Sequence, residues 1–215
     1  MTTKLDKHVE FETKYRVDGS KIYEFTQLVR AQTEDYQFIY AQGPDYYYTK
    51  SDNSFLRYRK GETDKGGRAE VTMKQKPIGA LKNVIRKEVN WRVDKTPQDT
   101  IHEGALMMGY TFNFKIYKMC HIYKFKDAVV VFYTVIDEEK NNDHFIEIEL
   151  DEETIHKLTE DEAWAVVRKY EAMLEPIGIT YRHRLNKSLF EMYVKPMAEP
   201  AQNVVLLNKE IKENV

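Results

Sequence analysis

Apolar and polar residues alternate along eight stretches of the chain, a pattern that predicts β-strands. We expect these strands over residues 8–17, 36–49, 54–60, 69–76, 83–93, 112–125, 128–137 and 144–150. Between the third and the fourth stretch, the segment "GETDKGGRAE" is polar and rich in glycine, which is typical of a hairpin loop.

Three further segments space their apolar residues as an α-helix does, over 18–32, 95–110 and 157–178. In the second segment, Thr96 can cap the helix and Pro97 fits its first position. In the third, Thr159 and Glu162 have the spacing of a capping box, and Gly178 ends the helix. These strands and helices together predict an α+β fold that is rich in antiparallel pairing.

The chain has 215 residues, which suffice for one sizeable domain with its own core. We expect residues 1–195 to form this domain and residues 196–215 to be a flexible or loosely docked tail. The net charge of −2 gives no strongly basic footprint for a nucleic acid. The single cysteine, Cys120, excludes an internal disulfide and favours a reducing compartment. Because the sequence has no apolar run of membrane length and no apolar signal core, we expect a cytoplasmic protein.

Charged residues make up 32% of the chain, and five strands carry them at every second position. One such strand is usually a solvated face, but five in one domain suggest that the charged faces converge. They would then line a closed or nearly closed β-barrel, with the apolar faces turned outward under the helices. The charged set is Glu10, Glu12, Glu88, Glu147, Glu149, Lys14, Arg57, Arg59, Lys74, Lys76 and Arg86.

The chemistry of such a lumen limits what it can bind. An unpaired charge taken out of water costs on the order of several kcal/mol, so the charges must pair with one another or with a ligand. A ligand that satisfies both signs must be anionic and must also bring cations. A polyphosphate with a divalent metal meets this need, because Arg and Lys bind phosphate oxygens and carboxylates bind Mg²⁺ or Mn²⁺.

The order of the charged motifs resembles that of CYTH-domain proteins, also called triphosphate tunnel metalloenzymes. The segments "VEFETK", "FLRYR", "TMKQK", "VIRKEV" and "HFIEIEL" are similar to the family's ExExK, LRxR, lysine, RxE and ExE strands. The segment "LNKSLFEMY" is similar to its C-terminal KSYxxLL segment, so the resemblance covers residues 8–193. It implies an eight-stranded antiparallel tunnel that binds triphosphates and requires Mg²⁺ or Mn²⁺.

The resemblance also implies roles for single residues. The implied metal ligands are Glu10, Glu12, Asp137, Glu147 and Glu149. The implied triphosphate ligands are Lys14, Arg57, Arg59, Lys74, Lys76, Arg86, Lys118 and Arg184. The implied catalytic residues are Lys14, Glu88, which orients a basic partner or a metal-bound water, and Lys187, which closes on the end phosphate with Arg184. Cys120 departs from the family pattern, because it stands where an arginine is usual.

Three functions are consistent with these residues. The leading one is a divalent-metal-dependent triphosphatase that acts on inorganic triphosphate, thiamine triphosphate or a nucleotide. The alternatives are a class IV adenylate cyclase and a catalytically weak triphosphate-binding module. We expect a triphosphate-containing small molecule as the partner rather than a membrane or a nucleic acid, and a homodimer stays open. The tyrosine-rich segment 38–49 is expected to pack on the outside, with a stacking platform for a ring as the alternative.

Overall fold

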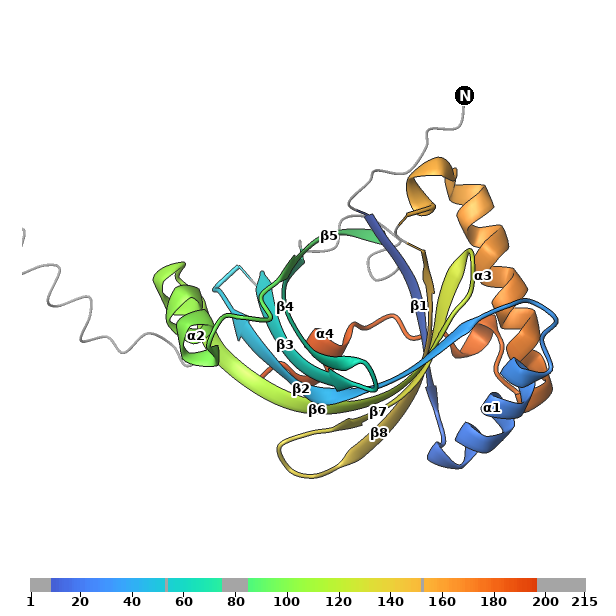
Figure 1. Ribbon diagram of the computed structural model, residues 1–215, viewed down its shortest axis with the longest axis horizontal. Helices are drawn as coiled ribbons and strands as arrows, with labels where there is room; N and C mark the ends of the chain where they lie inside the picture. Colours follow the sequence, from blue (N-terminus) through green and yellow to red (C-terminus); the bar gives the residue numbers. More distant parts are fainter. Residues whose placement is uncertain (1–8, 53, 75–84, 152, 197–215) are drawn as a thin grey trace, which may run out of the picture.

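The computed structural model is a closed antiparallel β-barrel with helices on its outside (Figure 1). It describes residues 9–52, 54–74, 85–151 and 153–196. Lys76 and, apart from residue 196, the expected tail lie outside the described residues, and of Arg86 only the backbone is described. The barrel confirms the α+β fold that the alternating pattern predicts.

Eight strands close the barrel. They are β1 (Val9–Val17), β2 (Gln37–Thr49), β3 (Phe55–Thr63), β4 (Gly66–Lys74), β5 (Ile85–Arg92), β6 (Thr111–Lys124), β7 (Ala128–Ile136) and β8 (Asn142–Leu150). Their order around the barrel is β1–β5–β4–β3–β2–β6–β7–β8. The first residues of β1 pair with β5 and the later ones with β8, so β1 closes the barrel.

The register of the strands brings charges of opposite sign side by side. Side chains alternate between the two faces of a strand, so residues opposite each other in register share a face. The opposed charged residues on the inner face are Lys14 and Glu147, Arg59 and Asp45, and Lys74 and Glu88.

Helices cover the barrel on two sides (Figure 1). The covering helices are α1 (Ile22–Arg30), α2 (Gln98–Met107) and α3 (Glu160–Leu174), whereas the short α4 (Leu189–Tyr193) packs Leu189 and Phe190 against residues of the inner face. Single 3-10 turns are η1 (Gly19–Lys21), η2 (Ile155–Lys157), η3 (Glu175–Ile177) and η4 (Tyr181–His183). The capping box of Thr159 and Glu162 is confirmed at the start of α3. The expected Thr96 cap is wrong, because Pro97 is the extended residue before α2 and no side chain caps that helix. None of the described helices is long and apolar enough to cross a membrane.

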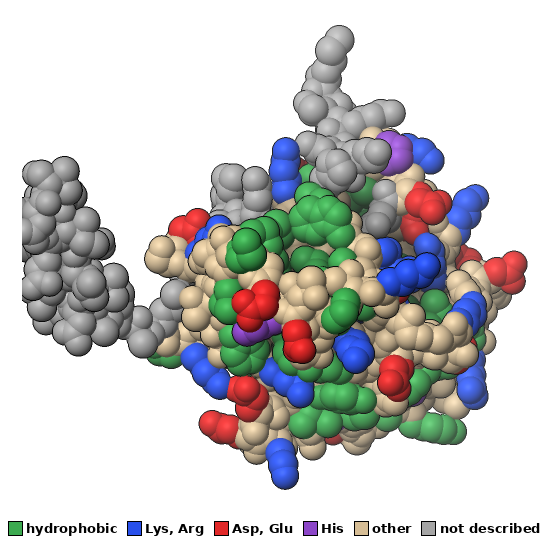
Figure 2. Space-filling view, turned by 60° about the vertical axis from the view of Figure 1, so that its left-hand side comes forward, with side chains coloured by type: hydrophobic (Ala, Val, Ile, Leu, Met, Phe, Trp, Pro, Cys, Tyr) green, Lys and Arg blue, Asp and Glu red, His purple; other side chains and the backbone are tan. Residues whose placement is uncertain are grey.

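Apolar side chains gather in three clusters, two outside the barrel and one inside it. The first outer cluster packs under α1 and α3, and the second packs under α2. Figure 2 shows the α2 side, where apolar side chains remain exposed among charged ones. The inner cluster consists of Tyr47, Phe55, Phe114, Ile116, Val131, Tyr133, Val135, Phe145, Leu189 and Phe190.

The inner cluster corrects the expectation that the apolar faces all turn outward and that the tyrosines of 38–49 pack only on the outside. An eight-stranded barrel is just wide enough for side chains to fill its interior. Where the lumen carries no charged residues, buried rings such as Tyr47 therefore pack it. The lumen is charged over one part of its length and apolar over the other.

Candidate functional site

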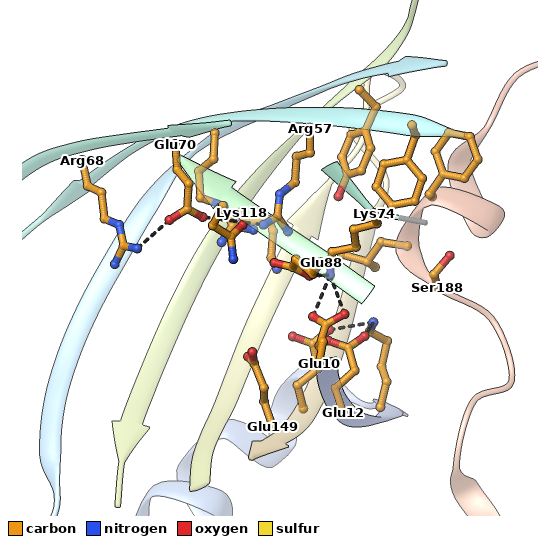
Figure 3. A pocket seen from close by; sticks show the side chains of 18 residues that line it. Glu10, Glu12, Arg57, Arg68, Glu70, Lys74, Glu88, Lys118, Glu149 and Ser188 are labelled. Atoms are coloured by element: carbon orange, nitrogen blue, oxygen red, sulfur yellow. Dashed lines mark hydrogen bonds and ion pairs between the residues drawn. The ribbon is translucent and has the colours of Figure 1, made fainter. Parts of the chain in front are cut away.

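A cavity of about 180 Å³ lies inside the barrel, next to the inner apolar cluster. Its wall carries six carboxylates and six basic side chains (Figure 3): Glu10, Glu12, Glu70, Glu88, Glu147, Glu149, Lys14, Arg57, Arg59, Arg68, Lys74 and Lys118. The rest of the wall is formed by Tyr47, Phe55, Asn90, Ser188, Leu189 and Phe190. Most of the residues that the sequence predicts for the site thus meet in one cavity, while their roles stay predictions.

Lys14 of β1 lies between two carboxylates. Its Nζ atom is 3.1 Å from Glu12 Oε1 and 2.7 Å from Glu147 Oε1. The hydroxyl of Tyr133 also donates a hydrogen bond of 2.7 Å to Glu147 Oε1. Burial raises the pKa of Glu147, but the charges of Lys14 and Lys118 and the hydrogen bond from Lys14 together outweigh burial and lower that pKa. Glu147 is therefore a carboxylate held by partners of its own.

Lys74 of β4 makes a similar bridge between Glu10, on the same strand as Lys14, and Glu88 of β5. Its Nζ atom is 2.6 Å from Glu10 Oε1 and 2.5 Å from Glu88 Oε2. Burial opposes ionisation of Glu88, yet Lys74 and Arg57 lower its pKa to about 2. A carboxylate with so low a pKa is a weak base at neutral pH. Its position suits the predicted role of orienting a basic partner better than that of accepting a proton.

Glu149 of β8 lies beside Glu12, its register partner on β1, and shares the cavity wall with further carboxylates (Figure 3). Burial raises its pKa well above the usual range, and Glu10, Glu12 and Glu88 raise it further. This side of the cavity thus has an excess of negative charge, which a proton or a cation would relieve. Within the described ranges, no three acidic, histidine or cysteine side chains are now grouped to hold a metal.

The basic side of the cavity has the converse excess. Lys118 of β6 is buried with its Nζ atom 3.9 Å from the ring centre of Tyr133. No carboxylate of the described chain lies within ion-pair distance of it, and burial lowers its pKa. Arg57 donates a hydrogen bond of 2.9 Å to Thr72 Oγ1, but its buried Nε has no partner among the described residues. Arg57 has one carboxylate at ion-pair distance, with Glu70 Oε1 3.8 Å from its Nη2. A buried cation without an anion, such as Lys118, is costly, so this side is suited to an anionic ligand.

Several residues of the site were missed by the sequence interpretation. Asp45 is fully buried and accepts two hydrogen bonds of 2.7 Å from Nε and Nη2 of Arg59. Arg68 donates a hydrogen bond of 2.6 Å to Glu70. The alternation along β4 could have predicted Arg68 and Glu70, because both share the inner face with Lys74. Asp45 carries a weaker signal, since tyrosines follow it on both faces of β2.

Three predicted site residues lie away from the cavity, which corrects the expectation that they reach its contents. Asp137 lies between β7 and β8, where its carboxylate accepts hydrogen bonds from backbone N–H groups of the turn. Arg184 lies outside the barrel and donates two hydrogen bonds of 2.6 Å to Glu171 of α3. Lys187 is exposed before α4. None of the three belongs to a strand, so alternation gives no information on where their side chains point.

Arg86 lies on β5 and Cys120 lies on β6. The backbone of Arg86 lies opposite Glu10 in the pairing of β1 with β5. Cys120 follows Lys118 on the inner face of β6, and burial raises the pKa of its thiol. A thiol whose pKa is raised is less ionised at neutral pH and therefore less reactive, and Cys120 packs against the inner cluster.

The fold is shared with solved structures, although no family model and no curated protein matches the sequence. The PH1819 protein of Pyrococcus horikoshii OT3 has a TM-score of 0.63 at 22% identity, over 85% of this chain and 97% of that one. A proposed adenylate cyclase of Vibrio parahaemolyticus has a TM-score of 0.60 at 19% identity, over 86% and 97%. The Hippeastrum protein HpAC1, proposed as an adenylyl cyclase and described as having a dominant triphosphatase activity, has a TM-score of 0.54 at 14% identity, over 86% and 94%.

The chain therefore shares the fold of these solved structures, an eight-stranded antiparallel barrel such as the resemblance to CYTH proteins implies. At these identities the likeness concerns the fold alone, and it covers nearly the whole length of each structure compared. The activity of this chain has to be argued from its own cavity.

Proposed function

We propose that the chain binds a triphosphate together with Mg²⁺ or Mn²⁺ inside the barrel and hydrolyses the triphosphate. One observation carries the proposal: a single cavity has an excess of each sign of charge on different parts of its wall. Lys118 lacks an anionic partner among the described residues, while Glu149 lies among further carboxylates. A complex of polyphosphate and divalent metal supplies both missing partners.

The basic residues of the wall are suited to hold the phosphate chain. Arg57, Arg59 and Lys118 come from β3 and β6 and face the same cavity. Arg side chains bind phosphate oxygens through planar, paired N–H donors, and a buried ammonium group adds a strong point charge. The hydrogen bonds that Arg57 donates to Thr72 and Arg59 donates to Asp45 restrict the orientation of the two arginines before any ligand binds. Donors held in this way stabilise negative charge on a leaving phosphate without having to reorganise.

The acidic side fits a divalent metal by the chemistry of its donors. Glu10, Glu12 and Glu149 offer hard oxygen ligands, which Mg²⁺ and Mn²⁺ prefer. The raised pKa of Glu149 is the expected mark of a buried carboxylate among other negative charges. A metal bound there would offset phosphate charge and lower the pKa of a bound water. Glu88 and Glu10 together hold the ammonium group of Lys74 at the cavity wall.

Hydrolysis is favoured over cyclisation by the rings beside the cavity. A cyclase must hold the nucleoside folded over the α-phosphate, and a free ring face is a common way to hold a base. The rings of Phe55 and Phe190 already stack on each other with centroids 4.5 Å apart. Those of Tyr47 and Phe114 do the same at 4.4 Å. The triphosphatase activity described for HpAC1, which has the same fold, agrees with this preference.

Product analysis tests the proposal. The purified protein is incubated with Mg²⁺ or Mn²⁺ and with inorganic triphosphate, thiamine triphosphate or ATP, and the products are separated. We expect orthophosphate, and no release without the metal. Formation of cyclic AMP and pyrophosphate would contradict hydrolysis and indicate a cyclase. Tight binding without turnover would indicate a triphosphate-binding module.

A further inference from the structure

Lys118 and Glu147 are oppositely charged side chains of the cavity wall that do not pair with each other. Lys14 and Lys74 each lie between two carboxylates, whereas Lys118 makes no ion pair within the described part of the chain. Burial lowers the pKa of Lys118, and the attraction of Glu147 is the largest of the effects that oppose it. Some feature of the barrel therefore keeps this cation and this carboxylate apart.

Tyr133 of β7 contacts both of these side chains. Its ring centre is 3.9 Å from Nζ of Lys118, and its hydroxyl donates a hydrogen bond of 2.7 Å to Oε1 of Glu147. The face of an aromatic ring attracts a cation, by about 2 kcal/mol when the two are buried. A phenol hydroxyl stabilises a carboxylate as a hydrogen-bond donor and leaves its charge in place. One neutral side chain thus serves Lys118 in place of a carboxylate and Glu147 in place of a further cation.

The strand register explains how one side chain reaches both charges. On the inner face of β7, Tyr133 lies between Val131 and Val135. In the pairing with β6, Val135 lies opposite Lys118. In the pairing with β8, Val131 lies opposite Glu147. This stretch of β7 therefore adds no charge to the lumen and places one hydroxyl and one ring between the lysine and the glutamate.

The ring of Tyr133 is held on both sides. It is completely buried and stacks on the ring of Phe145, its register partner on β8, with centroids 5.3 Å apart. Its register partner on β6 is Cys120, which packs against the same inner cluster. A side chain confined in this way keeps its ring face and its hydroxyl in fixed places, which preorganises the charged groups that it contacts.

We propose that Tyr133 is a positioning residue that keeps Lys118 and Glu147 from pairing. Its ring holds the ammonium group ready for the phosphate chain, and its hydroxyl holds the carboxylate ready for the metal. The inference rests on the proposed function and adds to it a residue from behind the cavity wall. Without Tyr133, the ammonium group and the carboxylate would pair, and each ligand would have to break that pair before it binds.

Binding of each ligand alone tests the inference without turnover. Calorimetry measures the Kd of Mn²⁺ in the absence of phosphate and the Kd of inorganic triphosphate in the absence of metal. Tyr133→Leu should weaken the binding of each ligand by about tenfold or more, because the two charged groups then pair. Tyr133→Phe keeps the ring and removes the hydroxyl. It should weaken Mn²⁺ binding by about tenfold and change triphosphate binding by less than about twofold.

Unchanged or tighter binding of triphosphate to the folded leucine variant would overturn the inference. Unchanged binding of Mn²⁺ to the phenylalanine variant would overturn the part played by the hydroxyl. Tyr133→Met, which also lacks a ring, replaces the leucine variant if that variant does not fold.

A double variant separates a positioning role from a general structural one. In the Lys118→Met background the ammonium group is gone, so adding Tyr133→Leu should not weaken triphosphate binding further. A further loss as large as that caused by Tyr133→Leu alone would show that Tyr133 acts through the packing of the barrel, and would overturn the inference.

The matched controls are Tyr48→Phe and Tyr48→Leu. Tyr48 is buried in the cluster under α2, with its hydroxyl 3.3 Å from Nδ1 of His102, so both variants should leave the two Kd values unchanged. If the unchanged protein binds neither Mn²⁺ nor inorganic triphosphate, the proposed function fails and the inference fails with it. If it binds both and the Tyr133 variants bind them equally well, only the inference fails.

Discussion

Lys115 and Lys118 lie three residues apart on β6 in opposite surroundings. Lys118 is buried against the ring of Tyr133 inside the barrel, whereas Lys115 is exposed, with its Nζ atom 5.3 Å from the ring centre of Tyr46. The pKa of Lys118 is lowered by burial, which means that its charge destabilises the folded protein. A residue that costs stability where a ligand is expected is typical of a binding site.

Lys118→Met should therefore change stability and binding in opposite directions. We expect a higher melting temperature, because a buried charge is removed, and a KM for triphosphate raised at least about tenfold, which corresponds to about 1.4 kcal/mol. Lys115→Met is the matched control and should change neither value. A lowered melting temperature with an unchanged KM would show that Lys118 is a structural residue.

The pH dependence of stability reports on Glu88. Its pKa falls from 4.5 to about 2 on folding, so the unfolded chain binds the proton more tightly. The stabilisation is complete above about pH 4.5 and is lost as the pH falls toward 2; from the shift it amounts to at most about 3 kcal/mol. Glu88→Gln should flatten this part of the curve of unfolding free energy against pH. A variant curve parallel to that of the unchanged protein between pH 5 and about 2.5 would contradict the assignment.

At the scale of elements, Glu171 of α3 joins the helix to β1 and to the segment before α4. Its carboxylate accepts hydrogen bonds of 2.6 Å from the hydroxyl of Tyr15 and from Nε and Nη2 of Arg184. Leu185 also donates its backbone N–H to the carbonyl of Lys14 at 2.8 Å. The network lies outside the barrel, so it holds β1 in place without facing the cavity.

Glu171→Ala should destabilise the protein and leave its substrate affinity nearly unchanged. Removing one partner of a buried ion pair costs about 3–5 kcal/mol, and half-exposed Arg184 can recover part of this from water. Urea unfolding measures the loss, and the KM of the folded fraction measures the affinity. Glu175→Ala, at the exposed end of the same helix, is the control. If the KM rises as much as for Lys118→Met, Arg184 has the substrate role that its sequence motif suggests.

The strands were predictable because their alternation is a local signal. The stretches 112–125 and 128–137 agree within one residue with β6 and β7. Alternation also shows that the two faces of a strand differ in polarity. It does not show which apolar residues turn into the barrel, so the inner cluster was missed. The five residues of α4 are too few to show a helical period. Arg184 is positioned by Glu171, a contact between distant segments that no local pattern encodes.

Inside the barrel, acidic and basic side chains are in excess on different parts of the cavity wall. The net charge of the chain is only −2, yet Lys118 and Glu149 lie in one cavity without a partner of opposite charge in direct contact among the described residues. Such a separation is costly in a medium of low dielectric constant unless ligands complete it. A cation bound at the acidic side and an anion bound at the basic side are then expected to strengthen each other's binding, because their opposite charges attract.

Thermal unfolding with Mn²⁺ and a slowly hydrolysed triphosphate analogue tests this coupling. We expect the two together to raise the melting temperature by more than the sum of their separate effects, with the analogue bound about tenfold or more tightly when the metal is present. Linkage requires that the analogue strengthen metal binding by the same factor, which calorimetry measures independently. Glu149→Gln removes one carboxylate from the acidic wall and should reduce the coupling, while the control Glu175→Gln should not. Strictly additive shifts in the unchanged protein would show that the two walls act separately, and the cavity would then be an anion site with no need of a metal.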